Sequence, residues 1–319
     1  GTSVPIEGRL WVLRELATRY PDGVWDLLGK IHPRPGETSF GTQEPSWRDF
    51  GRSELSPLTR GERTMAYRGY AELALELAVG SLGRQIDLLE FFGEYGPEYR
   101  VQLISLLSRA SSDSRDSATE WERLRDFIAR NRSFPDAQWS VKAKDLDQLE
   151  EFASQLAPKA PTTLHRWLLD NPWPELPRDA NDFEGRDAEL QRRRDEAIEE
   201  ILKVEGELAL CDFMLQTKYP HLVGSAVARV SRTRTASWLI GVISAWAKVG
   251  APNALHAIRA ASGLRREVDG GAWIDALLKE GTAMRWSATA RVSCFLDFPP
   301  TSETFELVSS VGLEAERLY

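Results

Sequence analysis

The feature that most constrains the fold is a highly charged stretch at 182–204 that carries a narrow apolar stripe. Leu190, Ala197, Ile201, the valine at the end of the stretch and then Leu208 recur at steps of three, four and seven residues, which is the spacing of one helix face. Most residues between them are Asp, Glu or Arg. A helix of this composition buries only its stripe, so we predict a long helix that joins two helical groups.

Helical spacing of apolar residues continues through most of the chain. Pro21 and Pro220 each precede such a pattern and are placed to open a helix. No run of alternating β-branched residues leads into a hairpin turn. The spacings between the eleven tryptophans do not settle on one period, which argues against a regular tetratricopeptide or ankyrin array. The predicted fold class is all-α, as an irregular α-solenoid or array of helical hairpins.

The expected organisation has two helical groups. The first covers 4–180 and contains a long loop at 32–57 that is rich in proline and glycine, and the second covers 181–319 and begins with the long charged helix. Residues 1–3 have the composition of an expression remnant. The last helical pattern is still in progress at Tyr319, so we expect the C-terminus to be a truncation.

Composition limits the partners and the compartment. A net charge of −8 and a pI near 5.3 argue against a polyanion as the main partner. Cys211 and Cys294 are the only cysteines, which excludes a disulfide framework or a thiolate metal cage and fits a cytoplasmic protein. No apolar run is long enough to span a bilayer, so no membrane association is expected.

Motifs that carry chemistry are missing. The four histidines are far apart in the sequence, and none has a second His or Cys three or four residues away. Neither phosphate-binding glycine motif, GxxxxGK[ST] or GxGxxG, occurs, nor does the GxSxG elbow of hydrolases. We therefore predict no catalytic, cofactor-binding or metal-binding residues, and a chain that is not itself an enzyme.

Two groups of residues are candidates for binding a partner. Trp47, Trp139 and Trp173 lie in proline-containing loops, where a tryptophan either clamps its loop to the core or is displayed to a partner. The second group flanks a turn with few acids nearby, and it would hold nucleic acid or a phosphorylated partner if its members lined one groove. It consists of Arg229, Arg232 and Arg234.

Two alternatives to a protein-binding role stay open. One is a nucleic-acid-binding helical scaffold that uses these three arginines. The other is an enzyme whose pocket lies under the 32–57 loop, which would require convergent polar groups and a strongly perturbed carboxylate or histidine. A further basic run, 192–194, is surrounded by acids at helical spacing, which indicates a salt-bridged surface.

Several aromatic and proline motifs resemble a known class of protein. They are YPDGVWDLL at 20–28, PSWRDF at 45–50, FPDAQW at 134–139, HRWL at 165–168 and WPELP at 173–177. Together they resemble the helical C-terminal region of large bacterial antiviral defence proteins of the STAND NTPase kind, over most of 9–230. The resemblance implies a sensor or scaffold segment that recognises a protein ligand, such as a phage protein, and signals to effector and NTPase domains elsewhere in the polypeptide. No catalytic residue carries over.

Overall fold

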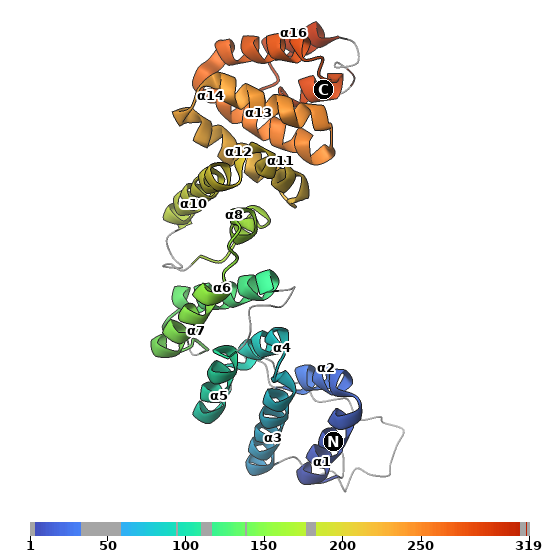
Figure 1. Cartoon of the computed structure of the whole chain (residues 1–319), viewed down its shortest axis with the longest axis vertical. Helices are drawn as coiled ribbons and strands as arrows, with labels where there is room; N and C mark the ends of the chain where they lie inside the picture. The colour runs from blue at the N-terminus through green and yellow to red at the C-terminus, as the bar shows by residue number, and fades with distance from the viewer. Residues whose placement is uncertain are drawn as a thin grey trace. The chain divides into compact units, whose positions relative to one another are not determined.

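A computed structural model of the chain describes residues 4–32, 59–93, 95–109, 117–137, 139–176, 183–312 and 317. Every regular element in these ranges is a helix, and they contain no strand (Figure 1). This confirms the all-α prediction, whereas the solenoid arrangement stays a prediction. Apart from His32, the predicted loop at 32–57 lies outside the described residues.

The helices divide into two compact units, the first formed by the described residues up to 157 and the second by 158–176 and the residues from 183 onward. Unit 1 contains α1 (Ile6–Arg19), α2 (Pro21–Ile31), α3 (Arg60–Ala78), α4 (Leu82–Asp87), η1 (Leu88–Phe91), α5 (Pro97–Leu107), α6 (Ser117–Ser133) and α7 (Ala143–Leu156). Unit 2 contains α8 (Pro161–Leu164), α9 (Arg166–Leu169), α10 (Phe183–Val204), α11 (Gly206–Gln216), α12 (Pro220–Val230), η2 (Ser231–Thr233), α13 (Ala236–Val249), α14 (Pro252–Ala283), α15 (Ala288–Ser293) and α16 (Ser302–Val311).

Helix ends follow local chemistry. Pro21 and Pro220 occupy the first positions of α2 and α12, as predicted, because proline fixes φ near the helical value and lacks the amide that would be unpaired there. At the start of α3 the Thr59 side chain accepts from the Glu62 amide, and the Glu62 carboxylate accepts from the Thr59 amide at 2.7 Å. Gly250 ends α13 in the left-handed conformation, with φ of 65°.

The long charged helix exists as predicted and belongs to unit 2, where it packs against α11 and α12. Leu190, Ala197 and Ile201 are buried, which confirms the inner part of the apolar stripe. Extending the stripe to Val204 and Leu208 was wrong, since these side chains are 63% and 84% exposed. The reason is a break in the helix: α10 ends at Val204, and Gly206 with φ of 87° redirects the chain into α11.

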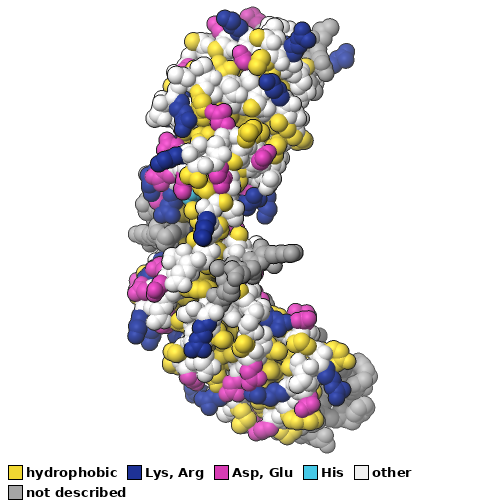
Figure 2. Space-filling model, in the orientation of Figure 1, with side chains coloured by type: hydrophobic (Ala, Val, Ile, Leu, Met, Phe, Trp, Pro, Cys, Tyr) yellow, Lys and Arg dark blue, Asp and Glu magenta, His cyan; other side chains and the backbone are white. Residues whose placement is uncertain are grey.

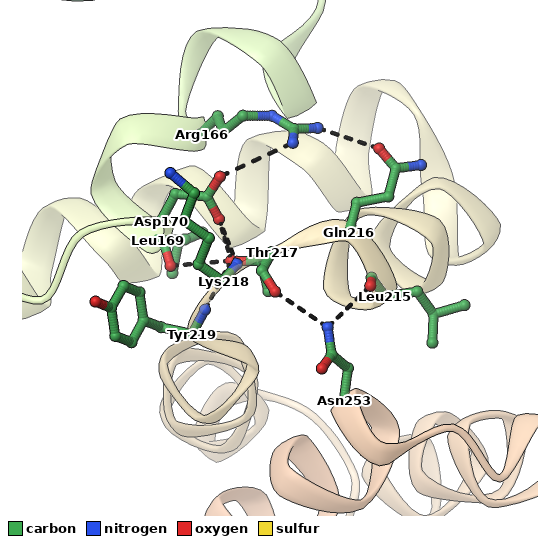
Figure 3. Close-up of polar contacts among 9 residues, drawn as sticks. All are labelled: Arg166, Leu169, Asp170, Leu215, Gln216, Thr217, Lys218, Tyr219 and Asn253. Atoms are coloured by element: carbon green, nitrogen blue, oxygen red, sulfur yellow. Dashed lines mark hydrogen bonds and ion pairs between the residues drawn. The ribbon is translucent and has the colours of Figure 1, made fainter.

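Segment 158–176 was predicted to belong to the first helical group, 4–180, but it packs inside unit 2. Figure 3 shows its polar contacts with the turn between α11 and α12. The Thr217 hydroxyl lies 3.0 Å from the Leu169 carbonyl oxygen and also contacts the Asp170 carboxylate. The same carboxylate accepts from the Lys218 amide at 2.8 Å. These contacts fix the end of α9 against the beginning of α12.

In unit 1, a buried histidine closes α2. The His32 ring stacks near Phe91, with ring centroids 4.8 Å apart, and its Nδ1 lies 3.2 Å from the Leu28 carbonyl oxygen. A carbonyl only accepts, so Nδ1 carries the proton, and Nε2 of the neutral ring accepts from the Tyr95 hydroxyl at 3.4 Å. Burial lowers the pKa of His32 and raises that of Tyr95, so both groups are neutral in the folded protein.

We expect His32 to make unit 1 less stable in mild acid. Its folded pKa lies below the ordinary value near 6.5, so its contribution is complete above that pH and is lost as the pH falls toward the folded pKa. Urea unfolding at about pH 7.5 and about pH 5.5 should show a larger loss for the unsubstituted chain than for His32→Phe, by up to about 1.4 kcal/mol, because pH 5.5 lies about one unit below the ordinary histidine pKa. Equal losses in the two proteins would contradict the neutral, buried state of His32.

Candidate functional site

Trp173 is displayed on a hydrogen-bonded loop of unit 2. Its side chain is 66% exposed, and its amide donates to the Asn171 side-chain oxygen at 2.9 Å. Arg186 donates to the Pro174 carbonyl oxygen at 3.2 Å, and Leu176 is buried. Of the two candidate tryptophans that the structure describes, Trp173 therefore combines high exposure with a backbone that is held on both sides.

Arg194 of α10 also holds this loop in place. It extends inward from α10, and its Nε donates to the Leu168 carbonyl oxygen at 2.8 Å while one Nη donates to those of Asn171 and Pro172 at 2.9 and 3.1 Å. Burial, and then the neighbouring charge of Arg229, lower the pKa of Arg194 to about 10, so it stays protonated at neutral pH. The prediction that this arginine belongs to a salt-bridged surface was wrong, because its side chain donates to backbone carbonyl oxygens.

The rest of that basic run behaves as predicted. Arg192 contacts Glu189 at 2.8 Å and Glu196 at 2.5 Å, and Arg193 contacts Glu189 at 2.6 Å. These residues lie three or four positions apart on the outer face of α10. Such exposed pairs solubilise the helix and add little to stability.

Trp139, the other candidate tryptophan among the described residues, differs from Trp173. Trp139 is 39% exposed, lies 5.9 Å from the Phe134 ring, and has its backbone against Gly93. Its turn is pinned by buried Asn131, whose side-chain oxygen accepts from the Val141 amide at 2.8 Å. This arrangement is closer to a clamp than to a displayed side chain. Trp47 lies outside the described residues.

The three candidate arginines have separate environments. Arg229 is mostly buried, and its Nε donates to both oxygens of Asp195 at 2.9 and 3.0 Å. Arg232 is exposed in η2. The Arg234 guanidinium lies 4.6 Å above the Trp238 ring, and Trp238 in turn donates to Glu207 at 2.8 Å. On the face drawn in Figure 2, the Lys and Arg side chains of the described residues are scattered among Asp and Glu side chains.

Sequence reasoning missed a polar groove of about 570 Å³ between α12 and α14. One wall carries His221, Ser225 and Arg229, which are four residues apart on one face of α12. The other wall carries His256, Arg259 and Glu267 of α14, and Asp297 lies beside it. The four-residue spacing on α12 is visible in the sequence, but its partners lie about 35 residues further along and no motif links the two sets.

The groove exists because α12 and α14 pack in parallel at very short range. A Cβ atom on Gly224 would lie 2.2 Å from the Ala257 carbonyl oxygen. Seven residues beyond Gly224, the Ser231 carbonyl oxygen accepts from Arg265 at 3.1 Å, and Arg265 is eight residues beyond Ala257. The two helices therefore run in the same direction, and their histidines share one end of the groove.

That end is anchored by the contacts of Figure 3. The Asn253 side chain, in the first turn of α14, donates to the carbonyl oxygens of Leu215 and Thr217 at 2.9 and 3.1 Å. These carbonyls end α11 immediately before α12 begins. The start of α14 is thus fixed beside the start of α12, which sets the position of His256 relative to His221.

Other chemistry is sparse in the described ranges. No group of three or more His, Cys, Asp or Glu residues there is arranged to hold a metal ion. Burial raises the pKa of Cys294 to about 12, and partial burial raises that of Cys211, so neither thiol is activated as a nucleophile. None of the described helices combines the length and hydropathy of a membrane-spanning segment.

Comparison of the chain with protein-family models, with curated proteins and with solved structures finds no match.

Proposed function

We propose that the chain is a non-enzymatic recognition module that binds a protein ligand, as the sensor or scaffold segment of a larger bacterial protein of the STAND NTPase kind. The observation that carries the proposal is Trp173, a large aromatic side chain held in solvent by a loop that Arg194 and Arg186 fix. Tryptophans of this kind are common centres of binding energy at protein interfaces. Because the loop is ordered before binding, little conformational entropy is lost in the complex.

The test uses two equally exposed tryptophans. The immobilised chain is incubated with extract from phage-infected bacteria, and each retained protein is purified and its Kd measured by calorimetry. Trp173→Ala should weaken a genuine ligand by about 30-fold, the effect of removing one hot-spot side chain. Trp11→Ala, in unit 1, removes a side chain that is 64% exposed and should leave the Kd within about twofold.

Two outcomes would contradict the proposal. One is that Trp173→Ala and Trp11→Ala weaken the Kd of every ligand equally, which would show that the Trp173 loop has no particular part in binding. The other is turnover of a nucleotide, an ester or a phosphodiester by the purified chain, at a rate that one substitution abolishes. Retardation of DNA or RNA that disappears on charge reversal at Arg232 and Arg234 would favour the nucleic-acid alternative.

A further inference from the structure

We infer that the groove between α12 and α14 is a binding site for a phosphate monoester group. This site is separate from the Trp173 loop, and the inference does not depend on the proposed function. It rests on the donors that the two helices place in the groove, on the direction in which those helices run, and on where the acids lie.

The groove presents several hydrogen-bond donors alongside two carboxylates. Arg229 and Arg259 each use Nε for one carboxylate, that of Asp195 and that of Asp297 respectively. The Nη groups of both arginines, and the Ser225 hydroxyl, make no hydrogen bond to another residue in the described part of the chain. A guanidinium held at Nε in this way presents its Nη edge in a fixed direction, which suits an oxyanion.

The parallel register orders these donors along the groove. Gly224 lies against Ala257, so Arg259 is at about the same height along the groove as Ser225. His221 and His256 lie nearer the N-terminal ends of their helices. Glu267 is eight residues beyond Arg259 on α14, about 12 Å along the axis, so this carboxylate lies toward the opposite end.

The number of donors selects the class of anion. Donors approach from both walls, from Arg259 on α14 and from Ser225 and Arg229 on α12. A carboxylate has two oxygens, which one guanidinium satisfies, whereas a phosphate monoester has three free oxygens and can bridge two walls. Asp297, which pairs with Arg259 at 2.5 Å, competes with such a ligand and limits its affinity.

His221 makes binding sensitive to pH. Partial burial, then His256 and Arg194, lower the pKa of His221, whereas Asp297 acts in the opposite direction. At neutral pH the ring is therefore uncharged. Protonation adds a donor and a positive charge facing the ligand, so a bound anion and a protonated His221 favour each other.

The experiment measures binding to the full chain by calorimetry at constant ionic strength, with inorganic phosphate, free phosphoserine and a phosphoserine peptide as probes. Histidine side-chain NMR signals report whether His221 and His256 sense the probe. Arg259→Gln should weaken binding about tenfold or more, because a charged hydrogen bond is lost. Lys248→Gln removes an exposed charge of unit 2 and should change the Kd less than about twofold.

A variant that binds phosphate more tightly cannot be explained by misfolding. Asp297→Asn removes the competing carboxylate and should tighten phosphate binding by about threefold, which damage to the fold would not do. Sulfate, which does not titrate in this range, should bind more tightly at about pH 6 than at about pH 8, and this difference should shrink in His221→Gln. A phosphoserine peptide that binds about tenfold more tightly than free phosphoserine points to a phosphorylated partner, and equal affinities point to small phosphate esters.

Three results would overturn the inference: absence of saturable phosphate binding, equal losses in Arg259→Gln and Lys248→Gln, or equally tight binding of a DNA duplex that lacks terminal phosphates. None of them bears on ligand binding at Trp173, so failure here is distinguishable from failure of the proposed function.

Discussion

Replacing Gly224 with alanine is expected to destabilise unit 2 by about 3 kcal/mol, the upper range for overpacking a close contact. The new Cβ would lie 2.2 Å from the carbonyl oxygen of Ala257 and 2.9 Å from its carbonyl carbon and Cα. These are backbone atoms of α14, so no side-chain rotation relieves the clash and the two helices must separate. Thermal unfolding followed by circular dichroism should show a fall in Tm of roughly 6–12 °C for a unit of this size.

Gly241 provides the matched control. It lies on the exposed side of α13, and a Cβ there meets nothing within 4 Å. Gly241→Ala should therefore stabilise the helix by up to about 1 kcal/mol, because alanine restricts the unfolded backbone and favours the helix. Similar effects of the two substitutions would contradict the close parallel packing of α12 and α14 on which the groove depends.

Local signals in the sequence predicted helix ends well. Pro21 and Pro220 act within one turn of the chain, so their effect does not depend on tertiary contacts. Glycine was also informative where it breaks a helix. Gly270 stands at a discontinuity, since α14 has a non-helical residue there, with φ of 58° and ψ of −135°.

The sequence did not distinguish glycines or arginines whose roles depend on a neighbouring helix. Gly224 and Gly241 both stand among apolar residues inside a helix. Only the approach of α14 makes Gly224 essential, whereas Gly241 is replaceable. Likewise, Arg192 and Arg194 are two residues apart, which turns their side chains to different faces of α10. The groove depends on both a close glycine contact and the direction of arginine side chains, and the register of α12 against α14 cannot be derived from either helix alone.

Arg194→Met is the second substitution with a large expected effect. Methionine fills a similar volume, but the buried carbonyl oxygen of Leu168 and the partly buried ones of Asn171 and Pro172 then lose their donor. Leaving buried acceptors unpaired costs about 1–3 kcal/mol for each group, so we expect a total loss of about 3 kcal/mol after partial access of water. Arg194→Lys should lose less stability than Arg194→Met but should still be less stable than the unsubstituted chain, since one ammonium cannot span three separated carbonyls.

A comparison with Arg192 shows whether this loss of stability comes from the hydrogen bonds to the three carbonyls or from removal of a positive charge. Arg192→Met removes an equal charge from the same helix but breaks only exposed pairs with Glu189 and Glu196, so it should change stability by less than about 0.5 kcal/mol. Urea unfolding measures the totals, and amide hydrogen exchange shows where they act: protection at 168–176 should fall in Arg194→Met alone. A loosened loop would no longer hold Trp173 in place, so the same variant should weaken the ligand that Trp173→Ala weakens, whereas Arg192→Met should bind it normally. Equal stability of the two methionine variants would mean that the 168–176 segment is held by α9 and the Thr217 contacts without help from Arg194.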